Sequence, residues 1–276
     1  MPSYRFCRPD DLTLIIRAIN ACYLMHYPDE PAMTAERLKE QMTLFDVRPG
    51  NCMVALERQQ PVGVVVSTRR DSGVWIQALG CQPAFQRRGI ASQLVEALLR
   101  KIAIQRAPLV TVDVSTNNTP ALRFFEAADF TVRGRYVCYQ GFVTEMPGIP
   151  GRIEAVPPPD LLAYYAPFHT TPACWERNAA SLARYGTLPQ GYAYYAQSTV
   201  QGYLIHWGNT ILDLAMAPHV DAEQVSAALL GRMRTAGYAH ATLAKVPEGE
   251  PVGLVLARLG FTPTADYLLM GQDLQR

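Results

Sequence analysis

One loop in the first half of the chain has the residue types that bind phosphate. The segment Gln86-Arg87-Arg88-Gly89-Ile90-Ala91 lies between an apolar, strand-like run and a segment with helical periodicity. Backbone N–H groups are unpaired at the start of a helix, and the helix dipole adds positive potential there. Gly89 and the small Ala91 let an anion approach the backbone closely, while Arg87 and Arg88 add charge. The segment therefore predicts a diphosphate site, unless its glycine is only a turn device.

The spacing of this loop, Gln/Arg-x-x-Gly-x-Gly/Ala, differs from two better-known phosphate loops. The dinucleotide loop needs more glycines, and the nucleoside-triphosphate loop ends in Lys-Ser/Thr. Residues 79–94 (LGCQPAFQRRGIASQL) closely resemble the acetyl-CoA-binding motif of the GNAT superfamily of N-acyltransferases. Further along, residues 118–130 (NTPALRFFEAADF) resemble the second signature of that family. The resemblance covers residues 3–143.

The resemblance implies a mixed sheet that splays open, with the pantetheine arm of acetyl-CoA in the gap beside the strand that ends at Cys81. A backbone N–H at the end of this strand would polarise the thioester carbonyl, as fixed dipoles do for a developing oxyanion. Carried over position by position, the implied cofactor-binding residues are Leu79, Cys81, Gln86, Arg87, Arg88, Gly89, Ile90, Ala91, Ser92, Asn118 and Phe125.

Catalytic residues are less evident than the cofactor loop. The family often has a tyrosine in the second signature that protonates the departing thiolate, but this chain has Phe125 there. Many relatives also use a carboxylate on the strand before the loop as general base, and residues 74–79 contain none. A primary amine with a pKa of about 10 must lose a proton before it attacks. The candidates are Asp113, as a base at the expected splay, and Tyr136 or Tyr139, as a phenol on the last strands; each could instead be a strand-end or packing residue.

Three more residues belong to the candidate site. Cys81 could form a covalent acyl-enzyme, but no histidine is near it in the sequence, and packing as a small buried side chain is the alternative. His26 and Tyr27 lie in the loop after the first predicted helix, which commonly covers the acceptor site in the proteins that this chain resembles.

The periodicity of apolar residues predicts the elements that position these side chains. Helices are expected over residues 12–23, 35–45, 90–102 and 120–128, and strands over 4–8, 52–57, 62–68, 74–81 and 109–114, with a final pair of strands over 130–143. A Pro- and Gly-rich segment, residues 147–159, is the predicted linker between domains 1–146 and 160–276. Beyond it, helices over 161–168, 173–185 and 222–236 and strands over 192–197, 202–207 and 211–217 repeat much of the same order.

The two halves also share sequence. Residues 91–99 (ASQLVEALL) match 222–230 (AEQVSAALL), and residues 122–130 match 253–261, both at an offset of 131, whereas residues 79–83 match 214–218 at an offset of 135. The second copy therefore lacks residues where the first has its phosphate loop, although chance similarity between two αβ units is the alternative. The predicted fold class is α/β: two tandem GNAT-like domains, each a splayed mixed sheet flanked by helices, with a degenerate second domain that lacks the phosphate loop.

Composition limits the possible partners. Lys and Arg number 25 against 24 Asp and Glu, and the net charge of +1 provides no overall field for nucleic acid or an anionic membrane. The six cysteines and five histidines form no metal-binding pattern, so reduced thiols and no metal are expected. No signal or membrane-spanning run is evident, which favours a cytoplasmic monomer or homodimer.

The sequence thus predicts an acyl-CoA-dependent N-acetyltransferase. It would transfer acetyl from acetyl-CoA to a primary amine of a small molecule or peptide by direct attack within a ternary complex. The alternative is a non-catalytic acyl-CoA-binding sensor or regulatory protein, which Phe125 and the missing strand carboxylate suggest.

Overall fold

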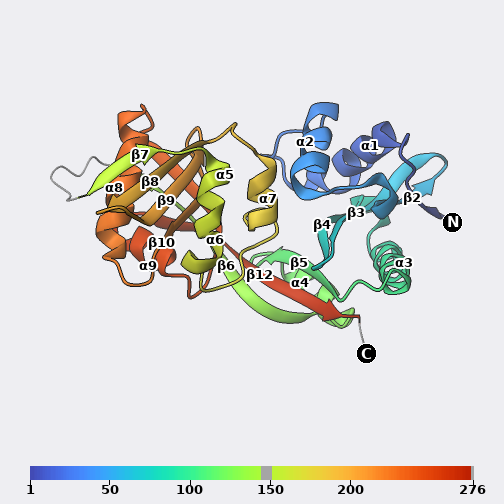
Figure 1. Ribbon diagram of the computed structural model, residues 1–276. Coiled ribbons are helices and arrows are strands. Elements are labelled where there is room, and N and C mark those ends of the chain that lie inside the picture. Colours follow the sequence, from blue (N-terminus) through green and yellow to red (C-terminus); the bar gives the residue numbers. More distant parts are fainter. Residues whose placement is uncertain (144–150, 275–276) are drawn as a thin grey trace. The chain divides into compact units, whose positions relative to one another are not determined.

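The computed structural model describes residues 1–143 and 151–274. Within these residues the chain forms two compact units, and their strands belong to one twelve-stranded sheet (Figure 1). Of the described residues, the first unit contains 1–114, 118–133 and 269–274, and the second contains 115–117, 134–143 and 151–268. The mixed α/β class expected from the sequence is confirmed.

The first unit is built on a sheet of mixed direction. Four strands pair antiparallel in chain order: β1 (Ser3–Phe6), β2 (Met53–Glu57), β3 (Gln60–Arg70) and β4 (Gly73–Cys81). The next strand, β5 (Leu109–Ser115), runs parallel to β4. Val64, Val65 and Val66 on β3 are fully buried, as expected for a central strand with helices on both faces.

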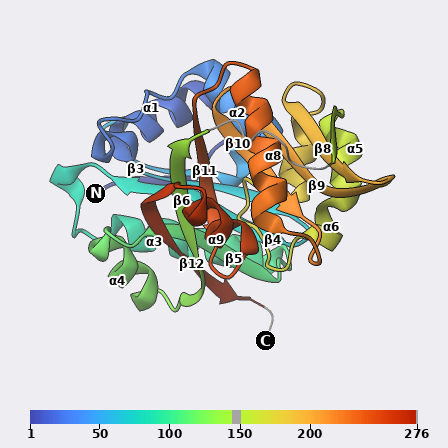
Figure 2. The same cartoon turned by 90° about the vertical axis from the view of Figure 1, so that its left-hand side faces the viewer.

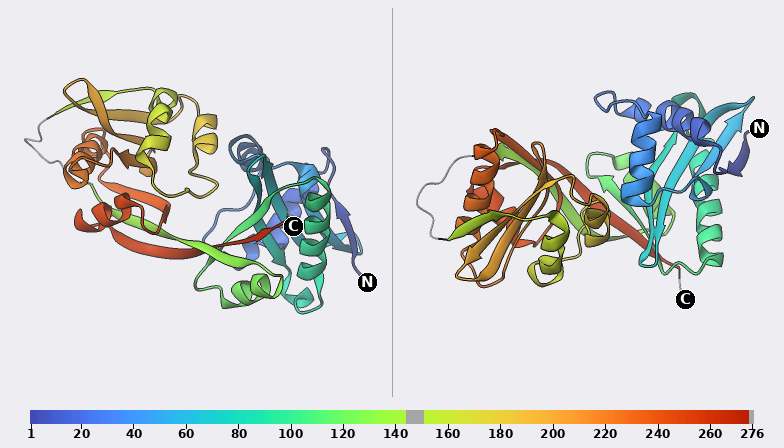
Figure 3. Two further views of the ribbon diagram at one scale, coloured as in Figure 1. Left: turned by 60° about the horizontal axis from the view of Figure 1, so that its bottom comes forward. Right: turned by 45° about the horizontal axis from the view of Figure 1, so that its top comes forward.

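Helices cover both faces of this sheet. On one face, α1 (Leu12–Cys22) and α2 (Ala35–Phe45) pack their apolar stripes against β2, β3 and β4. On the other face lies α3 (Ile90–Ile104), and Figure 3 shows it across the sheet from α1 and α2. A further helix, α4 (Thr119–Ala127), follows β5. Thr34 accepts a hydrogen bond from the Arg37 N–H and so caps α2.

Two long strands pass from one unit into the other. β6 (Thr131–Phe142) starts in the first unit and pairs with β11 (His240–Pro247) in the second. β12 (Thr262–Asp273) starts in the second unit and lies next to β5 in the first. Each unit therefore contains a strand from the other half of the chain. The predicted pair of strands over 130–143 is wrong, because this segment is one strand, and the compact units do not divide at residues 146 and 160.

The second unit has a similar plan. Its other strands are β7 (Arg152–Ala155), β8 (Gln190–Ala196), β9 (Thr199–Trp207) and β10 (Thr210–Met216), paired antiparallel in that order, and β11 runs parallel to β10. Helix α8 (Ala222–Thr235) lies across one face of the sheet with α9 (Pro251–Arg258) beside it (Figure 2). The short helices α5 (Pro158–Leu161) and α6 (Tyr165–Phe168) pack on the other face.

The linker prediction is only partly testable, since residues 147–150 lie outside the described residues. Within residues 151–159, the structure forms β7 and the start of α5, so this part is integral to the second unit. The helix expected over 173–185 is also shorter than predicted, because α7 spans only Ala179–Arg184, with Asn178 as its cap. None of the helices within residues 1–143 and 151–274 has the length and apolar character needed to cross a membrane.

Candidate functional site

Strands β4 and β5 stop pairing halfway along β4, and this is where the first unit opens. Their parallel pairs end at Ile76 and Val112. The next residue of β4, Gln77, is the extra residue of a β-bulge, since Val66 pairs with Ala78 while Ser67 pairs with Ile76. A bulge bends its strand and ends pairing on one side. We call the region beyond these residues the splay.

Backbone groups of β4 face the splay. Gln82 N–H donates to the Val62 carbonyl at 3.1 Å, which makes these two opposed residues a hydrogen-bonded pair. Hydrogen-bonded and non-bonded pairs alternate along an antiparallel ladder. The N–H and C=O groups of Leu79 and Cys81 therefore point away from β3, on the side that β5 has left. They form a strand edge that is not paired with β5.

The loop after β4 leads from this edge to the start of α3. It consists of a 3₁₀ turn, η3 (Pro83–Phe85), and the exposed residues 86–89. Arg87 has a φ of 61° and Gly89, the N-cap, a φ of 77°. A Cβ atom on Gly89 would meet nothing within 4 Å, so the backbone there is accessible. The first N–H groups of a helix have no partner within the helix.

Some side chains around this loop are exposed to solvent, and one is buried against the sheet. Gln86, Arg87, Arg88 and Ser92 are exposed, and the Arg88 guanidinium lies 5.2 Å from the centre of the Phe85 ring. Ile90 is 2 % exposed and anchors the start of α3 on β3, where an added Cβ at Gly63 would lie 2.6 Å from Ile90 Cγ2. The predicted cofactor residues from Leu79 to Ser92 therefore form one continuous region of the first unit, with exposed cationic side chains on it.

The second signature has a mainly structural role in its own helix. The Asn118 side chain accepts a hydrogen bond from the Ala121 N–H at 3.1 Å and caps α4. Phe125 is 3 % exposed, and its ring packs edge-on against Phe124 and Phe130. Phe125 thus fills the core beneath α4 and has no hydroxyl to donate.

The Cys81 thiol faces the interior. It is buried beside Gly63, and burial raises its pKa to about 11, although the Ala91 backbone N–H acts in the opposite direction. At neutral pH the side chain is therefore a thiol and not the nucleophilic thiolate. This observation disfavours an acyl-enzyme at Cys81, while its backbone groups remain at the splay.

The three catalytic candidates fall in different units. Asp113 follows Val112, the last β5 residue paired with β4, and so stands at the start of the splay. Tyr136 and Tyr139 belong to the second unit, where they pair with Pro247 and Leu243 on β11. Burial, followed by the nearby Asp266 carboxylate, raises the pKa of Tyr139. The structure brings Asp113 to the splay of the first unit but assigns the two tyrosines to the core of the second.

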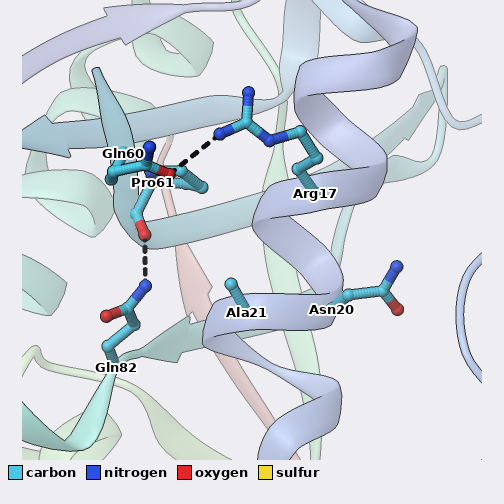
Figure 4. A pocket seen from close by; sticks show the side chains of 6 residues that line it. All are labelled: Arg17, Asn20, Ala21, Gln60, Pro61 and Gln82. Carbon is cyan, nitrogen blue, oxygen red and sulfur yellow. Dashed lines mark hydrogen bonds between the residues drawn. The ribbon is translucent and has the colours of Figure 1, made fainter.

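A histidine touches the same strand edge. His26 lies in η1 (Leu24–His26), directly after α1, and its Nε2 is 2.9 Å from the Cys81 carbonyl oxygen. Nearby, a pocket of about 420 Å³ is lined by residues of α1 and of the β3 and β4 ends: Arg17, Asn20, Ala21, Gln60, Pro61 and Gln82 (Figure 4). In it, Gln82 Nε2 donates to the Pro61 carbonyl at 2.7 Å, and Arg17 donates to Gln60 Oε1 at 2.9 Å.

The second unit repeats the splay at the same positions of its own strands. Parallel pairs between β10 and β11 end at Ile211 and Leu243, which are 135 residues after Ile76 and 131 after Val112. The extra residue of the bulge is Leu212, 135 after Gln77. The two sequence offsets thus match the two strands that border the splay. The internal repeat is a structural one.

A buried arginine fills this second splay. Arg177 is 6 % exposed, and its guanidinium donates to the carbonyls of Leu212 at 3.1 Å and Ala244 at 3.3 Å, on the two strands that separate. It also donates to Asp213 Oδ1 at 2.9 Å. At the second splay, a side chain therefore satisfies carbonyl acceptors on both of the strands that separate. No sequence pattern indicated this role, because Arg177 lies in an irregular segment far from both strands in the chain.

Asp213 is the centre of a buried polar cluster. His169 Nε2 lies 3.0 Å from Asp213 Oδ2, and the Tyr203 hydroxyl donates to the same oxygen at 2.7 Å. His169 Nδ1 lies 3.3 Å from Glu250 Oε1. Burial alone would lower the pKa of His169, but the bonds to Asp213 and Glu250 outweigh it and raise the pKa to about 9. At neutral pH the cluster holds a charged imidazolium between two carboxylates.

The start of α8 also differs from that of α3. Its N-cap, Asp221, accepts a hydrogen bond from the Gln224 N–H at 3.0 Å, and Glu223 adds a second carboxylate to the first turn. Two negative charges compete with any phosphate for the same N–H groups and dipole.

These features define a tandem α/β protein in which one of two splays leads to an accessible, basic helix N-terminus. Residues 13–130 match the family model of the acetyltransferase (GNAT) family. This region is therefore similar to a GNAT acetyltransferase domain, and the chain as a whole has the fold of a tandem GNAT protein. The resemblance noted in the sequence is confirmed.

Curated proteins match part of the chain in sequence, and solved structures match the whole chain in fold. A mycothiol acetyltransferase of Brachybacterium faecium is 29% identical over 129 residues, covering 44% of this chain and 38% of that protein. The match thus spans well under half the length of this relative. A GCN5-related N-acetyltransferase of Sphaerobacter thermophilus has a TM-score of 0.71 at 16% identity, covering 100% of this chain and 96% of that one. A tandem GNAT protein from the clavulanic acid biosynthesis pathway has a TM-score of 0.68 at 13% identity, and the alignment covers 100% of this chain and 99% of that one.

Proposed function

We propose that the chain is an acyl-CoA-dependent N-acetyltransferase that acts on a primary amine of a small molecule or peptide. The observation that carries the proposal is the edge of β4 that β5 leaves, which leads without a break to the accessible start of α3. An extended arm with amide groups has the same donors and acceptors as a strand, and so it fits the backbone groups of Leu79 and Cys81. The N–H groups at the start of α3 and the side chains of Arg87 and Arg88 fit a diphosphate.

Acetyl-CoA, when bound, supplies an activated acyl group as a thioester. The Leu79 N–H faces the splay and is placed to donate to an acyl oxygen as charge develops on it. Asp113, at the mouth of the splay, is placed to hold or deprotonate an ammonium group. Tyr136 and Tyr139 remain candidates for a proton donor to the thiolate. We place acyl transfer in the first unit alone, since Arg177 and Asp221 fill the corresponding positions of the second.

A non-catalytic acyl-CoA sensor is the second candidate. It is favoured by Phe125, whose buried ring replaces a possible proton donor, and by the absence of a carboxylate in residues 74–79. Such a protein would bind the cofactor without acceptor-dependent release of thiol.

Two measurements test the proposal. Calorimetry with acetyl-CoA on the intact chain should show one site, and the double variant Arg87→Ala/Arg88→Ala should bind at least tenfold more weakly. Arg100→Ala is the matched control, because this residue is also an exposed arginine of α3 but lies away from its start. Thiol release from acetyl-CoA with a panel of primary amines then separates the enzyme from the sensor: binding with no amine-dependent release would favour the sensor, and no binding would refute both.

A further inference from the structure

The loop between α1 and α2 is held against the first unit at both ends. Asn20 on α1 exchanges two hydrogen bonds with the backbone of Met33, at 2.8 and 3.0 Å. The rings of Tyr23 and Tyr27 lie 5.0 Å apart. Between these points, His26 Nε2 lies 2.9 Å from the Cys81 carbonyl oxygen. The imidazole is therefore held in place while the side chain remains exposed to solvent.

The partner of His26 locates its ring relative to the splay. The Cys81 carbonyl belongs to a non-hydrogen-bonded pair of the β3–β4 ladder and points to the side that β5 has left. His26 thus stands at the edge of the proposed acyl-CoA site. A carbonyl oxygen has two lone pairs, so this bond leaves Cys81 able to accept a second one.

The same bond fixes the tautomer of the ring. A carbonyl oxygen only accepts, so Nε2 must carry the proton, and in the neutral ring the lone pair then lies on Nδ1. Among the residues that the structure describes, Nδ1 has no hydrogen-bond partner. The basic nitrogen of His26 is accordingly free to take a proton from a bound amine.

Other groups that could take this proton are less suitable. The Cys81 thiol is buried, and burial raises its pKa to about 11. Burial raises the pKa of the Tyr139 phenol, which therefore keeps its own proton at neutral pH. Asp113 borders the splay from β5, but this residue already takes part in an interaction within the protein.

We infer that His26 is the general base that deprotonates the acceptor amine, an assignment that rests on the proposed acetyltransferase function. His26 Nδ1 takes one proton from the ammonium group and becomes part of an imidazolium. The nitrogen lone pair that is released forms the N–C bond to the acyl carbon as the C–S bond breaks, with its electron pair leaving on sulfur. The second proton of the nitrogen goes to this thiolate, and His26 returns its own proton to solvent.

The test separates a base from a merely structural residue. His26→Gln retains an N–H donor for the Cys81 carbonyl but has no basic nitrogen. With acetyl-CoA and ethylamine, which is protonated at neutral pH, kcat of this variant should fall by about 100-fold or more. With 2,2,2-trifluoroethylamine, which is similar in size but largely uncharged, kcat should change by less than threefold. Imidazole should restore ethylamine turnover to His26→Ala, and Met25→Gln, at an exposed position of the same turn, should match the wild type.

Two readouts do not depend on turnover. Nitrogen-15 NMR of the histidine rings should show His26 protonated at Nε2, and calorimetry should give His26→Gln a wild-type affinity for acetyl-CoA. A ring protonated at Nδ1 would overturn the inference. So would equal losses with both amines, or a selective loss with ethylamine in Asp113→Asn and not in His26→Gln. By contrast, failure of the wild type to bind acetyl-CoA would refute the proposed function itself.

Discussion

Gly89 and Asp221 are the N-cap residues of corresponding helices, α3 and α8, and they give the starts of these helices opposite properties. Gly89 has a φ of 77° and no side chain, so no N-cap group accepts from the N–H groups that follow it. Asp221 accepts one of the equivalent N–H groups with its own carboxylate. One repeat therefore has a helix start suited to an external anion, and the other carries a built-in anion.

Gly89→Ala should weaken acetyl-CoA binding through the backbone alone. An added Cβ meets nothing within 4 Å, but a φ of 77° costs a non-glycine residue about 1–2 kcal/mol, so the loop should relax away from the conformation that exposes its N–H groups. Calorimetry should show roughly a tenfold loss of affinity. Gly50→Ala is the control, because Gly50 is equally open and has no positive φ. Equal affinity in both variants would mean that the conformation at Gly89 does not shape the site.

Arg177→Ala should be strongly destabilising. The substitution leaves the Asp213 carboxylate, which is fully buried, without its guanidinium partner, and it removes the donors to Leu212 and Ala244. Removing one partner of a buried ion pair costs about 3–5 kcal/mol. Urea unfolding should detect this loss, whereas Arg100→Ala, in a pair with Glu96 on the surface, should change stability by less than about 1 kcal/mol. A small effect of Arg177→Ala would show that the second splay does not need to be filled.

Cys81→Ala should retain acyl transfer. The thiol is buried with its pKa raised to about 11, and only backbone groups of Cys81 face the splay. Initial-rate kinetics should keep the intersecting pattern of a ternary complex, with kcat within a few-fold of the wild type. Ping-pong kinetics in the wild type, together with inactivity of Cys81→Ala, would instead support an acyl-enzyme.

The sequence predicted the elements that local chemistry determines. The bounds of α2, residues 35–45, agree with the prediction, because Thr34 caps the helix and its apolar residues have a regular period. The offsets of 131 and 135 predicted an internal repeat, and the strands that border the two splays are related by these same offsets. The first result rests on signals close together in the chain, and the second on the similarity of two whole segments.

Features that depend on distant contacts could not be predicted in this way. The exchange of β6 and β12 between units involves pairing partners far apart in the chain, and nothing in the pattern of a strand identifies its neighbour. Arg177 has its role only because the carbonyls of Leu212 and Ala244 lose their strand partners. Similarly, His26 could be expected near the acceptor from its loop, but only its bond to Cys81 reveals the tautomer.

Stability should fall between about pH 6.5 and pH 9 because of His169. Its pKa is raised from 6.5 to about 9, since the bonds to Asp213 and Glu250 outweigh the effect of burial. The folded state therefore holds this proton to a higher pH than the unfolded chain does. The contribution of protonated His169 to the free energy of unfolding is complete below pH 6.5 and is lost as the pH rises through 9. Its size is on the order of 3 kcal/mol. Urea unfolding across this range should reveal the slope.

The variant His169→Gln separates the slope from the overall level of stability. It should be less stable than the wild type at pH 6, because Asp213 and Glu250 lose their cationic partner, but it should lack the decline toward pH 9. His219→Gln, which removes an exposed histidine of the same unit, should keep the wild-type slope. If His169→Gln declines as steeply as the wild type, the imidazolium held between the two carboxylates is not the source of the pH dependence.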